Sequence, residues 1–232
     1  MYKVERYTYM SIKNFIRRVV IASAGLFLFG FGVYLTIQAN LGAAPWDAFN
    51  LGLSSTIGIK YGTASIVVSL IILCIDIFLK EKIGIGMLLD AFIVGKTVDL
   101  FNLLNIVPAQ TNLAMKLLTI FAGMAIMGFS QYLYMTAALG CGPRDTLLVG
   151  LKRKISRVPI GVISIVILTV VTVIGWLLGG PIGIGTVICA GLEGPIMQLA
   201  FRIVKFVPTE VEHQSILDTF TALKNKQEDK EK

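Results

Sequence analysis

The chain has 232 residues, of which 55% are hydrophobic and 15% are charged, and its mean hydropathy is +0.78. This composition excludes a soluble globular domain and a disordered chain, and it is typical of a membrane protein. The formal net charge is +7, but the basic residues flank apolar segments, so we expect no nucleic-acid partner. The three cysteines and one histidine lie apart in the sequence, which predicts neither a metal site nor a cofactor.

Six apolar windows are long enough to cross a bilayer as helices. They lie at approximately residues 19–39, 62–79, 84–104, 117–138, 159–178 and 183–204. The expected fold is therefore an all-α polytopic membrane protein with six transmembrane helices. We divide the chain into a cytoplasmic interfacial segment (1–18), a first membrane repeat (19–104), a second membrane repeat (117–204) and a cytoplasmic tail (205–232). The tail has apolar residues at helical spacing after Pro208, which predicts a short amphipathic helix.

The distribution of Lys and Arg predicts the orientation of these helices. If the N-terminus is cytoplasmic, 18 of the 21 basic residues lie in cytoplasmic segments, two lie outside (Lys60 and Lys116) and Lys96 lies within the third window. Cytoplasmic loops carry the excess of positive charge in membrane proteins. We therefore expect both termini to be cytoplasmic.

The chain contains an internal repeat. Leu-Gly-x-x-Pro-x-Asp at 41–47 recurs as Leu-Gly-x-x-Pro-x-Asp at 139–145, and Ile-Gly-Ile-Gly at 83–86 recurs at 182–185. The offsets are 98 and 99 residues. Each half holds three predicted crossings, an odd number, so the second half must enter the membrane from the opposite side. The halves are expected to be inverted repeats, an architecture found in many secondary transporters.

The repeated motifs predict a short broken or re-entrant half-helix in each half. Gly42 and Gly140 are suited to ending a long helix, and the Pro that follows each suits the first position of a new one. We expect short helices at 45–53 and 143–151, with an Asp in the first turn of each. Such breaks line a cavity or pack against protein when they lie at membrane depth. The alternative is that both segments lie flat at the membrane interfaces as connectors.

Two acids lie near the cytoplasmic ends of their predicted helices. Asp76 and Asp90 lie three to seven residues from the cytoplasmic ends of the second and third windows, near Lys80 and Lys82. A charged side chain at this depth can extend toward water at the membrane surface. We expect these acids to reach the lysines or the water of the inner face.

Three further charges lie deeper. Lys96 and Glu193 are near the midplane of the third and sixth windows, and Asp99 is one turn beyond Lys96. An unpaired charge at this depth is costly, so we expect Lys96 and Glu193 to approach within salt-bridge or one-water distance, with Asp99 as a second acid on the same side. Such a cluster either holds the two halves in register or forms a titratable, solute-binding centre.

The paired motifs, with Trp46 in the first and Arg144 in the second, and the Gly-Ile-Gly turns at 84–86 and 183–185 resemble the YczE-like bacterial inner-membrane proteins, grouped loosely with the YyaS and YitT types. The resemblance covers about residues 20–205. It implies a multi-pass bacterial membrane protein and little about chemistry. The change from Trp46 to Arg144 suggests that the two copies have diverged in role.

No catalytic motif is present, so we expect no enzyme. The predicted function is a small-solute secondary transporter or permease. Its expected binding residues are Trp46, Asp47, Lys96, Asp99, Arg144, Asp145 and Glu193. The alternative is a non-transporting membrane accessory or regulatory scaffold protein. Expected partners are the lipid bilayer and a small solute or coupling ion, and a homodimer or a membrane protein partner stays open.

Overall fold

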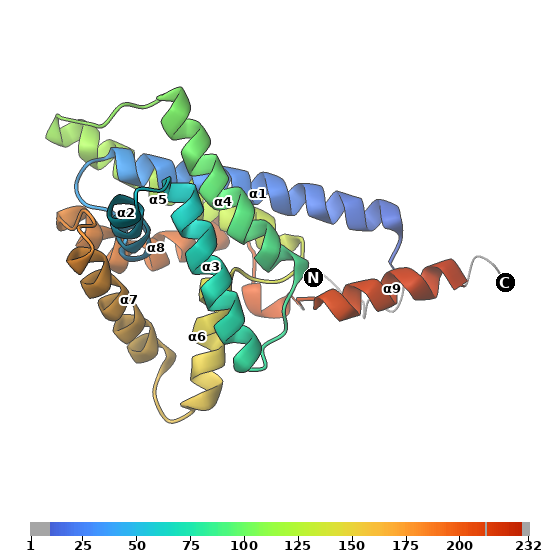
Figure 1. The fold of residues 1–232 in the computed structure, drawn as a ribbon. Coiled ribbons are helices and arrows are strands. Elements are labelled where there is room, and N and C mark those ends of the chain that lie inside the picture. Colours follow the sequence, from blue (N-terminus) through green and yellow to red (C-terminus); the bar gives the residue numbers. More distant parts are fainter. Residues whose placement is uncertain (1–9, 212, 229–232) are drawn as a thin grey trace.

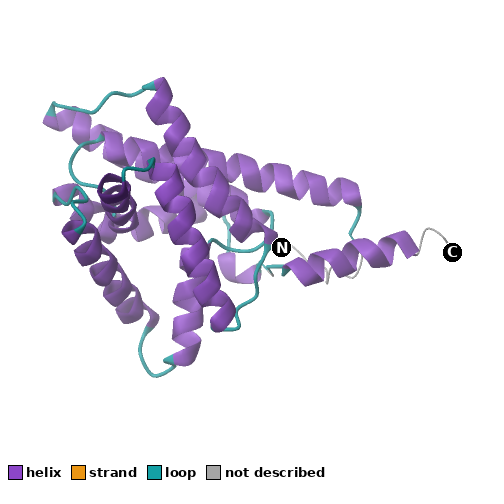
Figure 2. Cartoon of the chain, in the orientation of Figure 1, coloured by secondary structure: helices purple, strands orange, loops and turns teal. Residues whose placement is uncertain are grey.

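A computed structural model describes residues 10–211 and 213–228, and the regular elements in this part of the chain are all helical (Figures 1 and 2). The long helices are α1 (Ile12–Gln38), α3 (Tyr61–Phe78), α4 (Ile85–Leu104), α5 (Leu113–Thr136), α7 (Ile160–Leu177) and α8 (Ile184–Ile203). The shorter elements are α2 (Pro45–Ile57), α6 (Pro143–Lys154), the 3-10 turn η1 (Pro208–Glu210) and α9 (Ile216–Glu228).

Each of the six predicted windows contains one long helix. Five of them, α1, α3, α5, α7 and α8, are long and apolar enough to cross a membrane. Helix α4 has the same 20-residue length as α8, but it contains three charged residues, so its crossing stays a prediction. Helix α1 begins seven residues before the predicted window, because Lys and Arg are good helix formers and extend it. The rest of the predicted interfacial segment, residues 1–9, lies outside the described residues.

The two half-helices are present and follow the predicted breaks. The backbone is left-handed at Gly42 (φ 99°) and at Gly140 (φ 117°). Helices α2 and α6 then begin at proline and carry Asp47 and Asp145 in their first turns. Both helices extend beyond the predicted ends, to Ile57 and Lys154. In α6 the added turn holds three basic residues, which are favourable at the negative end of a helix dipole.

Each break packs against the start of a long helix from the other half of the chain. The amide of Gly185 at the start of α8 donates to the carbonyl of Leu41 (2.7 Å), and the amide of Gly86 at the start of α4 donates to the carbonyl of Leu139 (2.7 Å). The half-helices also pack on the other half of the chain: α2, from the first half, packs on α7, and α6, from the second half, packs on α3. The two halves therefore form one interlocked bundle.

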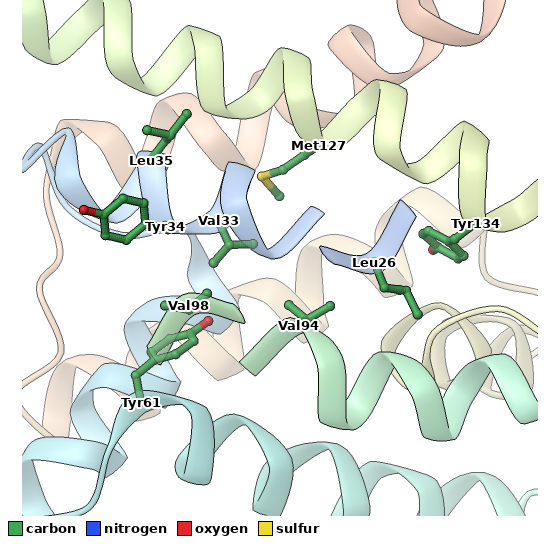
Figure 3. Packing of buried hydrophobic residues seen from close by; sticks show 9 residues of the cluster. All are labelled: Leu26, Val33, Tyr34, Leu35, Tyr61, Val94, Val98, Met127 and Tyr134. Carbon is green, nitrogen blue, oxygen red and sulfur yellow. The ribbon is translucent and has the colours of Figure 1, made fainter. Parts of the chain in front are cut away.

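A hydrophobic cluster at the centre of this bundle joins α1, α3, α4 and α5 (Figure 3). Its buried residues are Leu26, Val33, Tyr34, Leu35, Tyr61, Val94, Val98, Met127 and Tyr134. The buried hydroxyl of Tyr34 is satisfied, because it donates to the carbonyl of Val107 (2.7 Å) and accepts from the amide of the same residue (3.0 Å). The cluster fixes α1 against the long helices of both halves.

The predicted amphipathic helix of the tail is present as α9, and it docks on the bundle. The amide of Ile216 donates to the carbonyl of Ile83 (2.8 Å), and the amide of Met10 donates to the carbonyl of Ala222 (3.0 Å). Figure 1 accordingly places α9 at the same end of the molecule as the start of α1. Hydrogen bonds from the amide and hydroxyl of Ser215, together with Lys82 at 3.8 Å, lower the pKa of Asp218 in its first turn.

The break at Gly140 allows a test by substitution. Gly140→Ala should lower stability by about 1–3 kcal/mol, because alanine is strained at a left-handed φ and its Cβ would lie 2.9 Å from the Cα of Gly84. The matched control is Gly191→Ala in α8, where nothing lies within 4 Å of the added Cβ. The midpoint of thermal unfolding in detergent measures both. Equal midpoints for the two variants would contradict the assigned strain.

Candidate functional site

A cavity of about 220 Å³ lies where the two half-helices meet the long helices. All eight helices from α1 to α8 contribute side chains to its lining. Pockets for drug-sized ligands span about 300–1,000 Å³, and one water takes about 30 Å³ of liquid volume. The cavity therefore has room for a few waters or for one small solute.

The α2 side of the cavity is built around one carboxylate. Asp47 is 3% exposed, and its Oδ1 accepts a hydrogen bond from the hydroxyl of Tyr61 at 2.8 Å. The guanidinium of Arg144, on α6, lies 3.9 Å from the same oxygen and stacks over the ring of Trp46, 5.1 Å from its centroid. The basic residue of the second motif thus contacts the Trp and Asp of the first, so this network joins the two half-helices.

The lining of the cavity also holds three acids. Asp145 lies beside Tyr134, whose hydroxyl is 3.4 Å from its Oδ2. Asp90 enters from α4 and Glu193 from α8. A Cβ on Gly142 would lie 3.0 Å from Oδ2 of Asp90, so the turn before α6 needs glycine to approach this acid. Within the described chain, neither Asp90 nor Glu193 has a hydrogen bond or a salt bridge within 4.0 Å.

Five of the seven predicted site residues come together. Trp46, Arg144, Asp145 and Glu193 line the cavity, and Asp47 lies behind them in contact with Arg144. Their role in binding stays a prediction, because the structure contains no solute.

The predicted ion pair of Lys96 and Glu193 was wrong. Lys96 is exposed and does not line the cavity, and no salt bridge within the described residues joins it to Glu193 or to Asp99. Asp99 instead accepts a hydrogen bond from the amide of Gly62 at 2.8 Å. The predicted depth was counted along the helix, but Lys96 is two residues from Val94, which lines the cavity. Two residues rotate a side chain by about 200° around a helix, which turns Lys96 away.

The prediction for Asp76 was also wrong, and Asp90 has no salt bridge to a lysine within the described residues. Asp76 is 0% exposed and neither of its oxygens has a hydrogen-bond partner, while Lys82 pairs with Asp218. Asp90 lines the cavity. A signal for Asp90 was present, because it lies four residues before Val94 and hence on the same face of α4.

Sequence reasoning also missed the serines of the cavity. Ser65 and Ser69 on α3 and Ser164 on α7 all line it. Ser65 and Ser164 occupy equivalent positions in the Ser-Ile-Val segments of the two halves. The signal that could have identified them was the spacing of these polar residues within otherwise apolar helices.

Comparison with known proteins places the chain in a family. Residues 16–202 match the model of a family described as "Family of unknown function (DUF6198)". The chain belongs to this family. The match extends from α1 to α8 and so includes every helix that lines the cavity. No solved structure matches the chain.

Three relatives also match most of the chain. "Uncharacterized membrane protein YczE" of Bacillus subtilis is 35% identical over 179 residues, 76% of this chain and 82% of the relative. "Uncharacterized protein YyaS" of the same organism is 31% identical over 78% of this chain and 90% of the relative. An "Uncharacterized protein" of Haemophilus influenzae is 29% identical over 79% and 83%. The resemblance to YczE-like membrane proteins is therefore confirmed.

The hydrogen bond between Tyr61 and Asp47 can be tested by removing one hydroxyl. Tyr61→Phe should lower stability by about 1.5–3 kcal/mol, the usual range for a hydrogen bond to a charged group. The matched control is Tyr132→Phe, because the ring of Tyr132 packs on Phe206 and its hydroxyl has no hydrogen bond within the described chain. Unfolding midpoints in detergent measure the difference. A loss for Tyr132→Phe as large as that for Tyr61→Phe would contradict this role.

Proposed function

We propose that the protein is a secondary transporter for a small solute. The observation that carries the proposal is the charged cavity at the junction of the two half-helices. Broken backbone at membrane depth is tolerated where it lines a cavity, and discontinuous helices form the substrate sites of many transporters. Acids within a membrane bundle mark ion or solute pathways. This arrangement supports transport over a purely structural role.

We further propose six crossings arranged as two inverted repeats, with both termini in the cytoplasm. The contact between Met10 and Ala222 supports an even number of crossings, because it holds the two ends of the described chain on one side. The matched bonds of Leu41 with Gly185 and of Leu139 with Gly86 support the repeat. The excess of Lys and Arg in the segments on that side favours the cytoplasm of a bacterial inner membrane.

A difference between the two halves suggests how transport proceeds. In the first half α3 and α4 touch, and a Cβ on Gly95 would lie 2.8 Å from the carbonyl of Gly62. The equivalent glycines of the second half are Gly161 on α7 and Gly194 on α8, 99 residues later. Nothing lies within 4 Å of an added Cβ at either position. We propose that α7 and α8 close on each other in the opposite state while α3 and α4 separate.

The alternative function, an accessory or scaffold protein, is favoured by one observation. Helix α9 docks on the bundle but leaves Leu217 and Phe220 exposed, at 78% and 64%. These side chains suit contact with a membrane surface or with another protein. A scaffold needs no alternation of the cavity, and this difference separates the two functions.

The alternating mechanism predicts a block by one substitution. We expect a single cysteine at Ser164→Cys, in a chain without Cys74, Cys141 and Cys189, to react with an impermeant maleimide from both sides of a vesicle. Adding Gly194→Phe should restrict the reaction to one side, because the ring fits the open space beside α8 but prevents closure.

Gly191→Phe is the matched control, since it also has open space and the equivalent residue of the first half is Phe92. It should leave labelling from both sides intact. Labelling from one side only in the chain without either phenylalanine would reject alternation and favour the scaffold.

A further inference from the structure

The cavity has more acidic than basic groups in its lining. Its one basic side chain, Arg144, is held by Asp47 and Trp46. The three acids of the lining, Asp90, Asp145 and Glu193, have no basic partner within salt-bridge distance in the described chain. Carboxylates inside a membrane bundle are unfavourable when they have no partner. A bound solute that supplies positive charge would relieve this cost.

Two unused hydroxyls point to the same place independently of the acids. Ser65 and Ser69 are 3% and 4% exposed, both line the cavity, and within the described chain neither hydroxyl makes a hydrogen bond. A helical serine commonly bonds the carbonyl four residues earlier, as Ser130 does with Ile126. The hydroxyls of Ser65 and Ser69 are therefore free to accept hydrogen bonds from a solute. A hydroxyl can both accept and donate a hydrogen bond, so these two groups suit a polar ligand and can accept from one that carries N–H groups.

The apolar residues of the lining indicate the chemistry of the uncharged part of the ligand. Phe29, Val94, Leu148, Ile167 and Leu168 line the cavity with hydrocarbon. A bare inorganic ion would gain nothing from these side chains, and in the described residues no group of three or more His, Cys, Asp or Glu is placed to hold a metal ion. A short carbon chain would bury apolar surface against them.

We infer that the cavity binds a small organic cation, an amine or guanidine on a short hydrocarbon skeleton. The charged group lies among Asp90, Asp145 and Glu193, its N–H groups reach the two serines, and its carbon chain lies on the apolar wall. An anion would meet one basic group, Arg144, and four carboxyl groups, Asp47, Asp90, Asp145 and Glu193. That this cation is the transported solute rests on the proposed function, whereas its binding does not.

Binding is tested on the full chain in detergent with three matched probes: butylguanidinium, butylurea and butanesulfonate. The chain has two tryptophans, Trp46 in the cavity and Trp176, which is 65% exposed on α7. Trp176→Phe therefore leaves Trp46 as the single fluorescent reporter. We expect butylguanidinium at constant ionic strength to change its emission saturably, and the neutral and anionic probes to leave it unchanged. Saturable binding of butanesulfonate or butylurea as tight as that of butylguanidinium would overturn the inference.

Substitutions locate the site. Asp90→Asn and Glu193→Gln should each weaken butylguanidinium binding at least about tenfold, because each removes one side of a buried charge pair. Ser69→Ala changes no charge and should weaken it by about fivefold, the worth of one hydrogen bond. The matched control is Asp76→Asn, a buried acid outside the cavity, which should leave affinity unchanged. Unchanged affinity in the three cavity variants, or an equal loss in Asp76→Asn, would overturn the assignment.

The same probes in proteoliposomes separate the two proposals. Flux of butylguanidinium that Glu193→Gln abolishes supports both. Saturable binding without flux would overturn transport and leave the cation site standing. If butanesulfonate is transported while butylguanidinium is neither bound nor transported, the cation site is overturned and transport stands.

Discussion

The fold depends on how the backbone is satisfied where two helices end inside the bundle. The end of a helix leaves carbonyl groups without partners, and the start of a helix leaves amides without partners. Here the free amides of Gly185 and Gly86, in the first turns of α8 and α4, donate to the carbonyls of Leu41 and Leu139 in the turns that follow α1 and α5. Glycine is required at this approach, because a Cβ on Gly185 would lie 2.8 Å from the carbonyl of Gly42. These two bonds set where α2 and α6 begin.

The position of the half-helices in turn decides which charges meet. Asp47 and Asp145 occupy equivalent places, but their surroundings differ because the residue before each Asp differs. Arg144 reaches across to Asp47 and Trp46, so the first Asp is paired and buried. Trp46 carries no charge that could pair with Asp145, and Asp145 is exposed, with the hydroxyl of Tyr134 as its one side-chain hydrogen-bond partner in the described chain. The divergence of one motif position therefore produces one structural acid and one available acid.

Features encoded locally could be predicted from the sequence, and features that depend on helix rotation could not. The half-helices follow from Gly, Pro and Asp within a few residues, and these breaks were predicted at the correct positions. The surroundings of Lys96 were not predicted correctly, because depth along a helix can be counted from the sequence but the direction of a side chain is set by packing. Here the close contact of Gly62 with Gly95 fixes the rotation of α4. Val94 and Asp90 consequently face the cavity and Lys96 does not.

The contact between α3 and α4 also bears on which state of the proposed cycle is favoured. The amide of Gly62 lies in the first turn of α3 and donates to the carboxylate of Asp99, where a negative charge is favourable beside a helix N-terminus. The position equivalent to Asp99 in the second half is Gln198, 99 residues later. A glutamine oxygen can accept the amide of Gly161 if α7 and α8 close, but a hydrogen bond to a neutral acceptor is weaker than one to a carboxylate. In the proposed cycle the two closed arrangements would therefore share one geometry and differ in free energy, and the hydrogen bond between Gly62 and Asp99 would favour the present one.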